Sequence, residues 1–188
     1  MEDLIIVDCQ NDFIDGTLAC AHGQKAVENL IAFMNTHDVR VRYSSDWHKP
    51  TNQSFRENGG IWPVHCVQES HGAALSADFA HALKKEENKP GKANIYYKGT
   101  DDAVEEYSAF FGRNTDGQCL GENTSSHIYV GGIALEYCVK ETVLAFLEKG
   151  IRVTLLRDCL GWVDEKACDG VYEELRGKGV TVEDSDRV

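Results

Sequence analysis

The fold is decided by the stretch His127-Ile-Tyr-Val-Gly-Gly-Ile-Ala-Leu-Glu-Tyr-Cys138-Val-Lys-Glu-Thr-Val-Leu-Ala-Phe-Leu-Glu-Lys-Gly150. Residues 127–130 form a short apolar run before two glycines, which predicts a buried strand that ends in a tight turn. The apolar residues that follow recur at helical spacing from Val139 to Leu147, and Gly150 ends the pattern. The stretch therefore predicts a strand, a turn and a helix whose first turn contains Cys138.

Two interpretations of Cys138 follow from this position. Free backbone N–H groups and the positive end of the helix dipole favour a thiolate over a thiol, and the same N–H groups can receive an oxyanion. A small cysteine is also an ordinary buried residue. This stretch alone does not decide between a nucleophile and a packing residue.

The rest of the chain repeats the alternation of strand and helix. We expect further strands over residues 4–7, 39–43, 94–97, 152–156 and 180–182, helices over 24–35, 74–84 and 164–176, and a short helix or loop over 105–111. Such alternation predicts an α/β protein with a mostly parallel sheet covered by helices on both faces, a three-layer arrangement. Without a repeat or a break in composition, residues 1–188 are expected to form one domain.

Composition narrows the possible partners. The formal net charge is −12 and no basic patch is visible, which argues against binding to nucleic acid or to an anionic membrane surface. There is no apolar run of transmembrane length and no signal-peptide pattern, so a cytosolic location is expected. The seven cysteines contain no CxxC pair and are expected to be free thiols. A homo-oligomer is left open.

Five chemically capable residues fall at or just beyond the ends of predicted strands: Asp8, Asp46, His48, Lys98 and Cys138. In an open parallel sheet, the carboxyl ends of the strands converge on the ligand crevice. We therefore expect these side chains to meet at one edge of the sheet.

Asp46 and His48 lie two residues apart, so in an extended segment both side chains point the same way. With His65, they offer one carboxylate and two imidazoles, a set that suits zinc, iron or manganese. The alternative is that they are polar residues of a surface loop.

Asp8 and Lys98 also have two interpretations. They are either a salt bridge at the sheet edge or part of a catalytic set. In the second case Asp8 is the base for the thiol of Cys138, and Lys98 holds that carboxylate and favours the thiolate.

Three aromatic residues are close in sequence to these polar positions: Phe13, Trp62 and Tyr107. Core packing is their ordinary role. Beside a cluster of polar groups, they are also suited to wall a pocket for a flat ring.

Five segments together resemble one family. They are Val7-Asp-Cys-Gln-Asn-Asp-Phe13, Asp46-Trp-His48, Trp62-Pro-Val-His-Cys-Val-Gln68, Lys98-Gly99 followed by Tyr107-Ser-Ala-Phe110, and Gly132-Ile-Ala-Leu-Glu-Tyr-Cys-Val139. In this order they are similar to the nicotinamidase/pyrazinamidase branch of the isochorismatase-like cysteine hydrolases. The resemblance extends from residue 4 to about 160, which is most of the chain.

The resemblance implies a six-stranded parallel sheet and the hydrolysis of nicotinamide to nicotinate and ammonia. It implies Asp8, Lys98 and Cys138 as the catalytic triad, with a cis peptide before Ala134 that aims the N–H groups of Ala134 and Cys138 at an oxyanion. It further implies a divalent metal, first of all zinc, on Asp46, His48 and His65. Phe13, Trp62, Tyr107 and Ala134 would then contact the aromatic amide.

The sequence departs from the family at one ligand position. Many members carry a further histidine shortly after the Asp-x-His motif, where this chain has Asn52. Ser54 and Glu57 are nearby oxygen ligands, and Glu57 is the residue we expect to take this role.

Three other functions are weighed against a nicotinamidase. Family members that act on carbamoyl or ureido compounds share the Asp, Lys and Cys but generally lack the metal motif, and isochorismatases lack the cysteine. A redox or binding protein that uses Cys138 as an exposed thiol would leave Asp46 and His48 unexplained.

Overall fold

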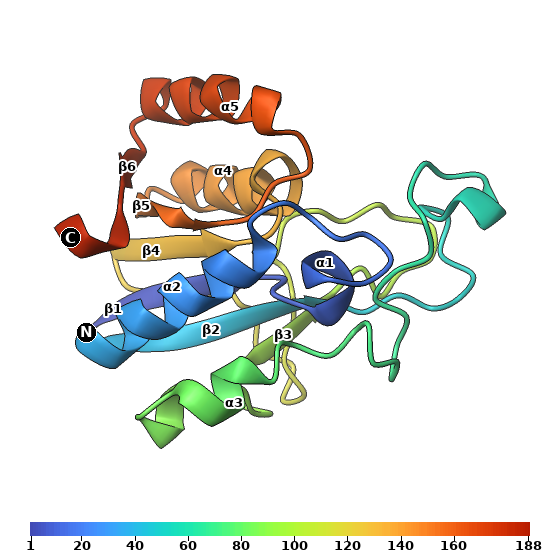
Figure 1. Ribbon diagram of the computed structural model, residues 1–188, viewed down its shortest axis with the longest axis horizontal. Coiled ribbons are helices and arrows are strands. Elements are labelled where there is room, and N and C mark those ends of the chain that lie inside the picture. Colours follow the sequence, from blue (N-terminus) through green and yellow to red (C-terminus); the bar gives the residue numbers. More distant parts are fainter.

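The computed structural model describes all residues from 1 to 188 and contains one six-stranded sheet (Figure 1). Its strands are β1 (Glu2–Val7), β2 (Val39–Asp46), β3 (Ile95–Lys98), β4 (His127–Gly132), β5 (Arg152–Leu160) and β6 (Thr181–Glu183). They lie in the order β3-β2-β1-β4-β5-β6, and every neighbouring pair is parallel. The predicted α/β fold with a parallel sheet is confirmed.

Helices cover both faces of this sheet. The longer ones are α2 (Gly23–Thr36), α4 (Lys140–Glu148) and α5 (Glu165–Gly177), and the shorter ones are α1 (Asn11–Ile14) and α3 (Asp78–Ala82). Four further turns are helical, namely η1 (Arg56–Asn58), η2 (Glu86–Asn88), η3 (Leu135–Val139) and η4 (Ser185–Arg187). None of the helices combines the length and the apolar character that crossing a membrane requires.

Alternation along β1 divides the interior into two cores. Leu4 and Ile6 contribute to a core with residues of α2 and α3, whereas Ile5 and Val7 contribute to a core with residues of α4 and α5. All four β1 side chains are fully buried. A central strand of a parallel sheet needs apolar side chains on both faces, which explains the continuous apolar run at the N-terminus.

The helix expected over residues 74–84 is shorter than predicted, and only Asp78–Ala82 is α-helical. The backbone before it pairs with the segment after β1, since Asn11 N–H donates to the Ala74 carbonyl and Ser76 N–H donates to the Cys9 carbonyl. These tertiary hydrogen bonds replace helical ones. Residues 105–111, expected as a short helix or loop, form a loop.

The two glycines of the deciding stretch lie inside β4 and do not form the predicted turn. Gly132 has φ +127°, and a Cβ atom there would lie 2.1 Å from the carbonyl oxygen of Val7 on β1. Glycine is thus needed because two strands approach closely, and the chain turns only afterwards, at Ile133 and Ala134. A single π-helical turn, η3, then leads into α4 and contains Cys138.

Candidate active site

All five strand-end residues meet at the carboxyl edge of the sheet, with His48 beside Asp46 and the other four in one cluster. Asp8 follows β1, Asp46 ends β2, Lys98 ends β3, and Cys138 lies on the turn after β4. The Lys98 Nζ lies 2.9 Å from Asp8 Oδ2 and 3.5 Å from Cys138 Sγ, and it donates a hydrogen bond to Asp46 Oδ1. All four side chains are buried. The sheet therefore gathers a thiol, an ammonium and two carboxylates into one cluster.

Lys98 is the shared cation of the two carboxylates. Burial alone would lower the pKa of Lys98, but Asp46 and Asp8 outweigh it and hold that pKa well above its usual value. Burial raises the pKa of Asp8, and Lys98 opposes this only in part. Burial also acts to raise the pKa of Asp46, but Lys98 and His48 outweigh it and the pKa stays below its ordinary value.

The surroundings of Cys138 favour the thiol over the thiolate. Burial raises the pKa of the Cys138 thiol well above its ordinary value, and the carboxylates of Asp8 and Asp46 add to this, while Lys98 lowers it only in part. Desolvation of the Cys138 thiol thus outweighs the effects of the helix start and of Lys98 on its pKa. A neutral thiol beside a base is the arrangement that the structure supports.

Asp8 is placed to be that base. Its Oδ1 accepts a hydrogen bond of 2.6 Å from the hydroxyl of Ser44, and its Oδ2 has no contact of this kind beyond the Lys98 ion pair. Carboxylate oxygens of Asp8 and Asp46 and the Cys138 sulfur all lie within 4.8 Å of one another. A proton can therefore pass from the thiol to Asp8 over a short distance.

The backbone N–H of Ala134 donates no hydrogen bond in the protein, although Ala134 is buried. Ala134 precedes the η3 turn and lines the same pocket as Cys138. The peptide bond between Ile133 and Ala134 is cis, as the resemblance implies. This free N–H is a donor for an oxyanion that forms beside the sulfur.

Asp46, His48 and His65 form the candidate metal site. The Nδ1 of His48 lies 2.8 Å from the Gly99 carbonyl oxygen, and the Nδ1 of His65 lies 2.7 Å from that of Pro63. Because both Nδ1 atoms face backbone acceptors, both Nε2 atoms are left facing Asp46 Oδ2, at 3.4 and 4.0 Å. Burial lowers the pKa of His65, which favours the neutral form that binds metals.

The donor set fits a divalent ion, and the fourth residue differs from the sequence-based expectation. Glu57 is exposed on η1 and does not line the pocket, because the buried Phe55 anchors this segment and turns the following residues to solvent. Ser54 lies in the pocket instead, and its hydroxyl is buried without a hydrogen-bond partner. The Asn52 side chain accepts the N–H of Ser54. Glu57, the further ligand expected from the sequence, thus lies outside the pocket, whereas Ser54 lies inside it.

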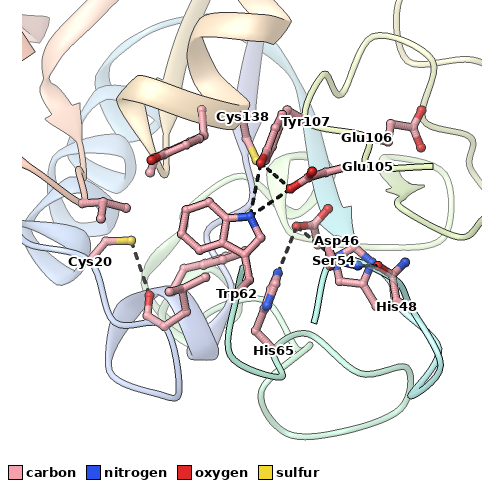
Figure 2. A pocket seen from close by; sticks show the side chains of 16 residues that line it. Cys20, Asp46, His48, Ser54, Trp62, His65, Glu105, Glu106, Tyr107 and Cys138 are labelled. Atoms are coloured by element: carbon pink, nitrogen blue, oxygen red, sulfur yellow. Dashed lines mark hydrogen bonds and ion pairs between the residues drawn. The ribbon is translucent and has the colours of Figure 1, made fainter. Parts of the chain in front are cut away.

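These groups line a pocket with an empty volume of about 520 Å³. Figure 2 shows Trp62 in its centre, with Cys138 and Tyr107 beyond the indole and Asp46 and His65 beside it. Phe13, Tyr137 and Ala134 also line it. The three aromatic residues singled out in the sequence, Phe13, Trp62 and Tyr107, all contribute to its wall.

Several lining residues were not predicted from the sequence: Leu18, Cys20, Glu105, Glu106, Tyr137 and Val163. Tyr137 could have been found from its place beside Cys138, and the two glutamates from theirs before Tyr107. Leu18, Cys20 and Val163 carry no chemical signal and come from segments far from the motifs. Only the tertiary structure brings them together.

Comparison with known proteins identifies the family. A family model described as the isochorismatase domain matches residues 3–187. The nicotinamidase of Escherichia coli strain K12 is 32% identical over 205 residues, which cover 95% of this chain and 92% of that protein.

Solved structures agree with this assignment. The pyrazinamidase of Pyrococcus horikoshii in complex with zinc has a TM-score of 0.79 at 29% identity, covering 97% of this chain and 98% of that one. PnC1 from L. infantum in complex with nicotinate has a TM-score of 0.85 at 30% identity, covering 99% and 93%. The N-carbamoylsarcosine amidase of Thermoplasma acidophilum has a TM-score of 0.71 at 25% identity, covering 100% and 99%. Because the family model spans nearly every residue, the chain belongs to the isochorismatase family.

Proposed function

We propose that the protein is a metal-assisted cysteine amidohydrolase that converts nicotinamide, and also pyrazinamide, to the acid and ammonia. The observation that carries this proposal is the buried Asp8–Lys98–Cys138 cluster, which shares Asp46 with a set of two histidines beneath an aromatic pocket. One small pocket thus contains a nucleophile, a base and candidate metal ligands. Such a pocket is suited to a substrate with a flat ring and an amide group.

In this proposal the ring lies between Phe13 and Trp62, and its carboxamide points to Cys138. Asp46, His48 and His65 would hold the metal, with the Ser54 hydroxyl as the nearest further oxygen. When bound, zinc (or else iron or manganese) supplies a Lewis acid that anchors the ring nitrogen, directly or through water. The L. infantum relative carries nicotinate and the P. horikoshii relative carries zinc, which supports both assignments.

The chemistry divides into two halves. Asp8 takes the proton of the Cys138 thiol as the sulfur attacks the amide carbon, and the Ala134 and Cys138 N–H groups receive the oxyanion. The oxyanion collapses to a thioester as Asp8 protonates the departing ammonia. Asp8 then deprotonates a water molecule that attacks the thioester, which releases the acid and restores the thiol.

The main alternative is a carbamoyl or ureido amidase, because the N-carbamoylsarcosine amidase of T. acidophilum is also similar. Such a substrate carries a carboxylate and needs a cation. Apart from the proposed metal, no cation is free for such a carboxylate. No lysine or arginine lines this pocket, Lys98 is already paired with two carboxylates, and Glu105 and Glu106 add negative charge. The lining thus favours a neutral ring amide.

Ammonia release by the purified, reduced, zinc-supplied protein tests the proposal. We expect release from nicotinamide by the wild type, none by Cys138→Ala, and little from N-carbamoylsarcosine. Binding of nicotinamide by Cys138→Ala shows that this variant keeps its pocket. Normal turnover by Cys138→Ala would reject the nucleophile, and faster release from N-carbamoylsarcosine than from nicotinamide would reject the substrate class.

A further inference from the structure

Two loops meet over the pocket, one after β2 and one after β3. Their bases are joined, since the Gln53 N–H donates to the Asp102 carbonyl at 3.0 Å and the Thr51 hydroxyl donates to the Asp102 carboxylate at 2.6 Å. The first loop carries Trp62 and the second carries Glu105 and Tyr107. The two loops are thus joined below the residues that line the pocket.

At the tips, one carboxylate oxygen joins both loops. Glu105 Oε1 accepts the Trp62 indole N–H at 3.0 Å and also accepts the hydroxyl of Tyr107. The indole nitrogen is also 3.2 Å from the Tyr107 oxygen, so the three groups form a closed triangle (Figure 2). On its other side Trp62 meets the Tyr137 ring edge to face, with the centroids 5.0 Å apart.

The groups beneath this triangle are closed off from solvent. Cys138 is 7% exposed, Asp46 4% and His65 5%. Trp62 and Tyr107 are only partly buried, and Glu105 itself is exposed. Trp62 is thus part of the wall around the buried Cys138.

We infer that Glu105 is a positioning residue, whose carboxylate latches Trp62 and Tyr107 across the pocket and holds the indole as a fixed wall for the substrate ring. This inference rests on the proposed function for its substrate. Glu105 acts through Trp62 and Tyr107, not on the amide, so its loss weakens ring binding and leaves the chemical step intact. The latch opens to admit the amide and closes over it.

Replacing Glu105 separates hydrogen bonding from charge. Glu105→Ala removes the acceptor, and we expect the KM for nicotinamide to rise about tenfold, as for the loss of one ordinary hydrogen bond, with kcat changed less than about twofold. Glu105→Gln keeps an acceptor oxygen without charge, so its KM should lie close to that of the wild type. Tyr107→Phe keeps the hydrogen bond between Trp62 and Glu105, so its KM should lie between those of wild type and Glu105→Ala. Glu148→Ala, which removes an exposed carboxylate on α4, is the matched control.

A spectroscopic signature tests the latch without substrate. The chain has three tryptophans, so a nitrogen–proton correlation spectrum contains three indole signals, and Trp62→Phe assigns one of them. Glu105→Ala should move the Trp62 signal and speed exchange of its proton with water, whereas Glu148→Ala should not.

An unmoved Trp62 signal in Glu105→Ala, or an unchanged KM, would overturn the latch. An equal rise of KM in Glu105→Gln and Glu105→Ala would assign the effect to charge and overturn it as well. If the wild type fails to hydrolyse nicotinamide while the Trp62 signal still responds to Glu105→Ala, the proposed function fails and the latch stands.

Discussion

Asp46 contributes both to the Lys98 cluster beside Cys138 and to the candidate metal site. One carboxylate oxygen, Oδ1, accepts from Lys98 beside Cys138, and the other, Oδ2, faces the Nε2 atoms of His48 and His65. A change in the metal set is therefore carried to the nucleophile through a single carboxyl group. In the proposed function, this shared carboxyl group would link the metal site to the nucleophile.

Asp46→Ala is expected to lose the metal and to weaken ring binding. It removes a direct ligand, so metal affinity should fall by more than the roughly 10- to 100-fold typical of losing an outer hydrogen-bond partner. Elemental analysis after dialysis with zinc measures this.

Glu57→Ala is the control for this measurement, because Glu57 is exposed and outside the pocket. It should keep the metal of the wild type. Unchanged metal content in Asp46→Ala would remove the site, and loss of metal in Glu57→Ala would restore Glu57 as a ligand.

At the scale of the element, the strand–turn–helix unit of β4, η3 and α4 sets the place of Cys138. The unit begins where β4 closely approaches β1, and this approach is possible because residue 132 is glycine. The turn that follows leaves the Ala134 N–H free and directs Cys138 to the sheet edge. The position of the nucleophile thus depends on how closely two strands approach.

Gly132→Ala should destabilise the protein by at least about 2 kcal/mol, because the new methyl group overlaps the β1 backbone and the residue has a positive φ. The free energy of unfolding from urea titration measures this change.

Gly170→Ala is the matched control. Gly170 lies within α5 and a Cβ there meets nothing within 4 Å, so alanine should stabilise the protein by about 0.5–1 kcal/mol. Equal stability of Gly132→Ala and wild type would contradict the close approach of β4 and β1.

At the scale of the whole molecule, a second ion cluster around the buried Asp3 lies at the opposite end of the sheet. Asp3 on β1 pairs with Arg40 at 2.6 Å and Arg42 at 3.1 Å, both on β2, and accepts the Ser125 N–H that precedes β4. It joins three chain segments that form the centre of the sheet. Burial acts to raise the pKa of Asp3, but Arg40, Ser125 and Arg42 outweigh it and the pKa lies below its ordinary value.

The stability that Asp3 contributes should depend on pH. A carboxyl group whose pKa is depressed by folding stabilises the protein above its unfolded pKa of about 3.9 and loses this contribution as the pH falls below it. Asp3→Asn should therefore be less stable at neutral pH and lose less stability on acidification than wild type. Urea unfolding from about pH 7 to about pH 3 measures both effects.

Asp186→Asn is the comparison, since Asp186 is exposed on the C-terminal turn. The stability of this variant should match that of the wild type at every pH. An identical pH dependence in Asp3→Asn and wild type would show that Asp3 does not contribute in this way.

Much of the fold and of the site could be predicted from the sequence. The alternation of apolar strands and amphipathic helices predicted the parallel sheet, and the residues that end its strands predicted where Asp8, Asp46, Lys98 and Cys138 meet. These predictions succeed because they depend on local periodicity and on one rule of parallel sheets, that the carboxyl ends share an edge.

The rest was decided only by the tertiary structure. Whether Cys138 is a thiol or a thiolate depends on how far burial outweighs Lys98, and desolvation exists only once the chain is folded. That Ser54 lines the pocket and Glu57 does not depends on how the loop after β2 folds, and the Glu105 latch depends on two loops that are distant in sequence. The sequence by itself determined which chemical groups reach the edge of the sheet, whereas packing and the exclusion of water decided their charge, their neighbours and what closes over them.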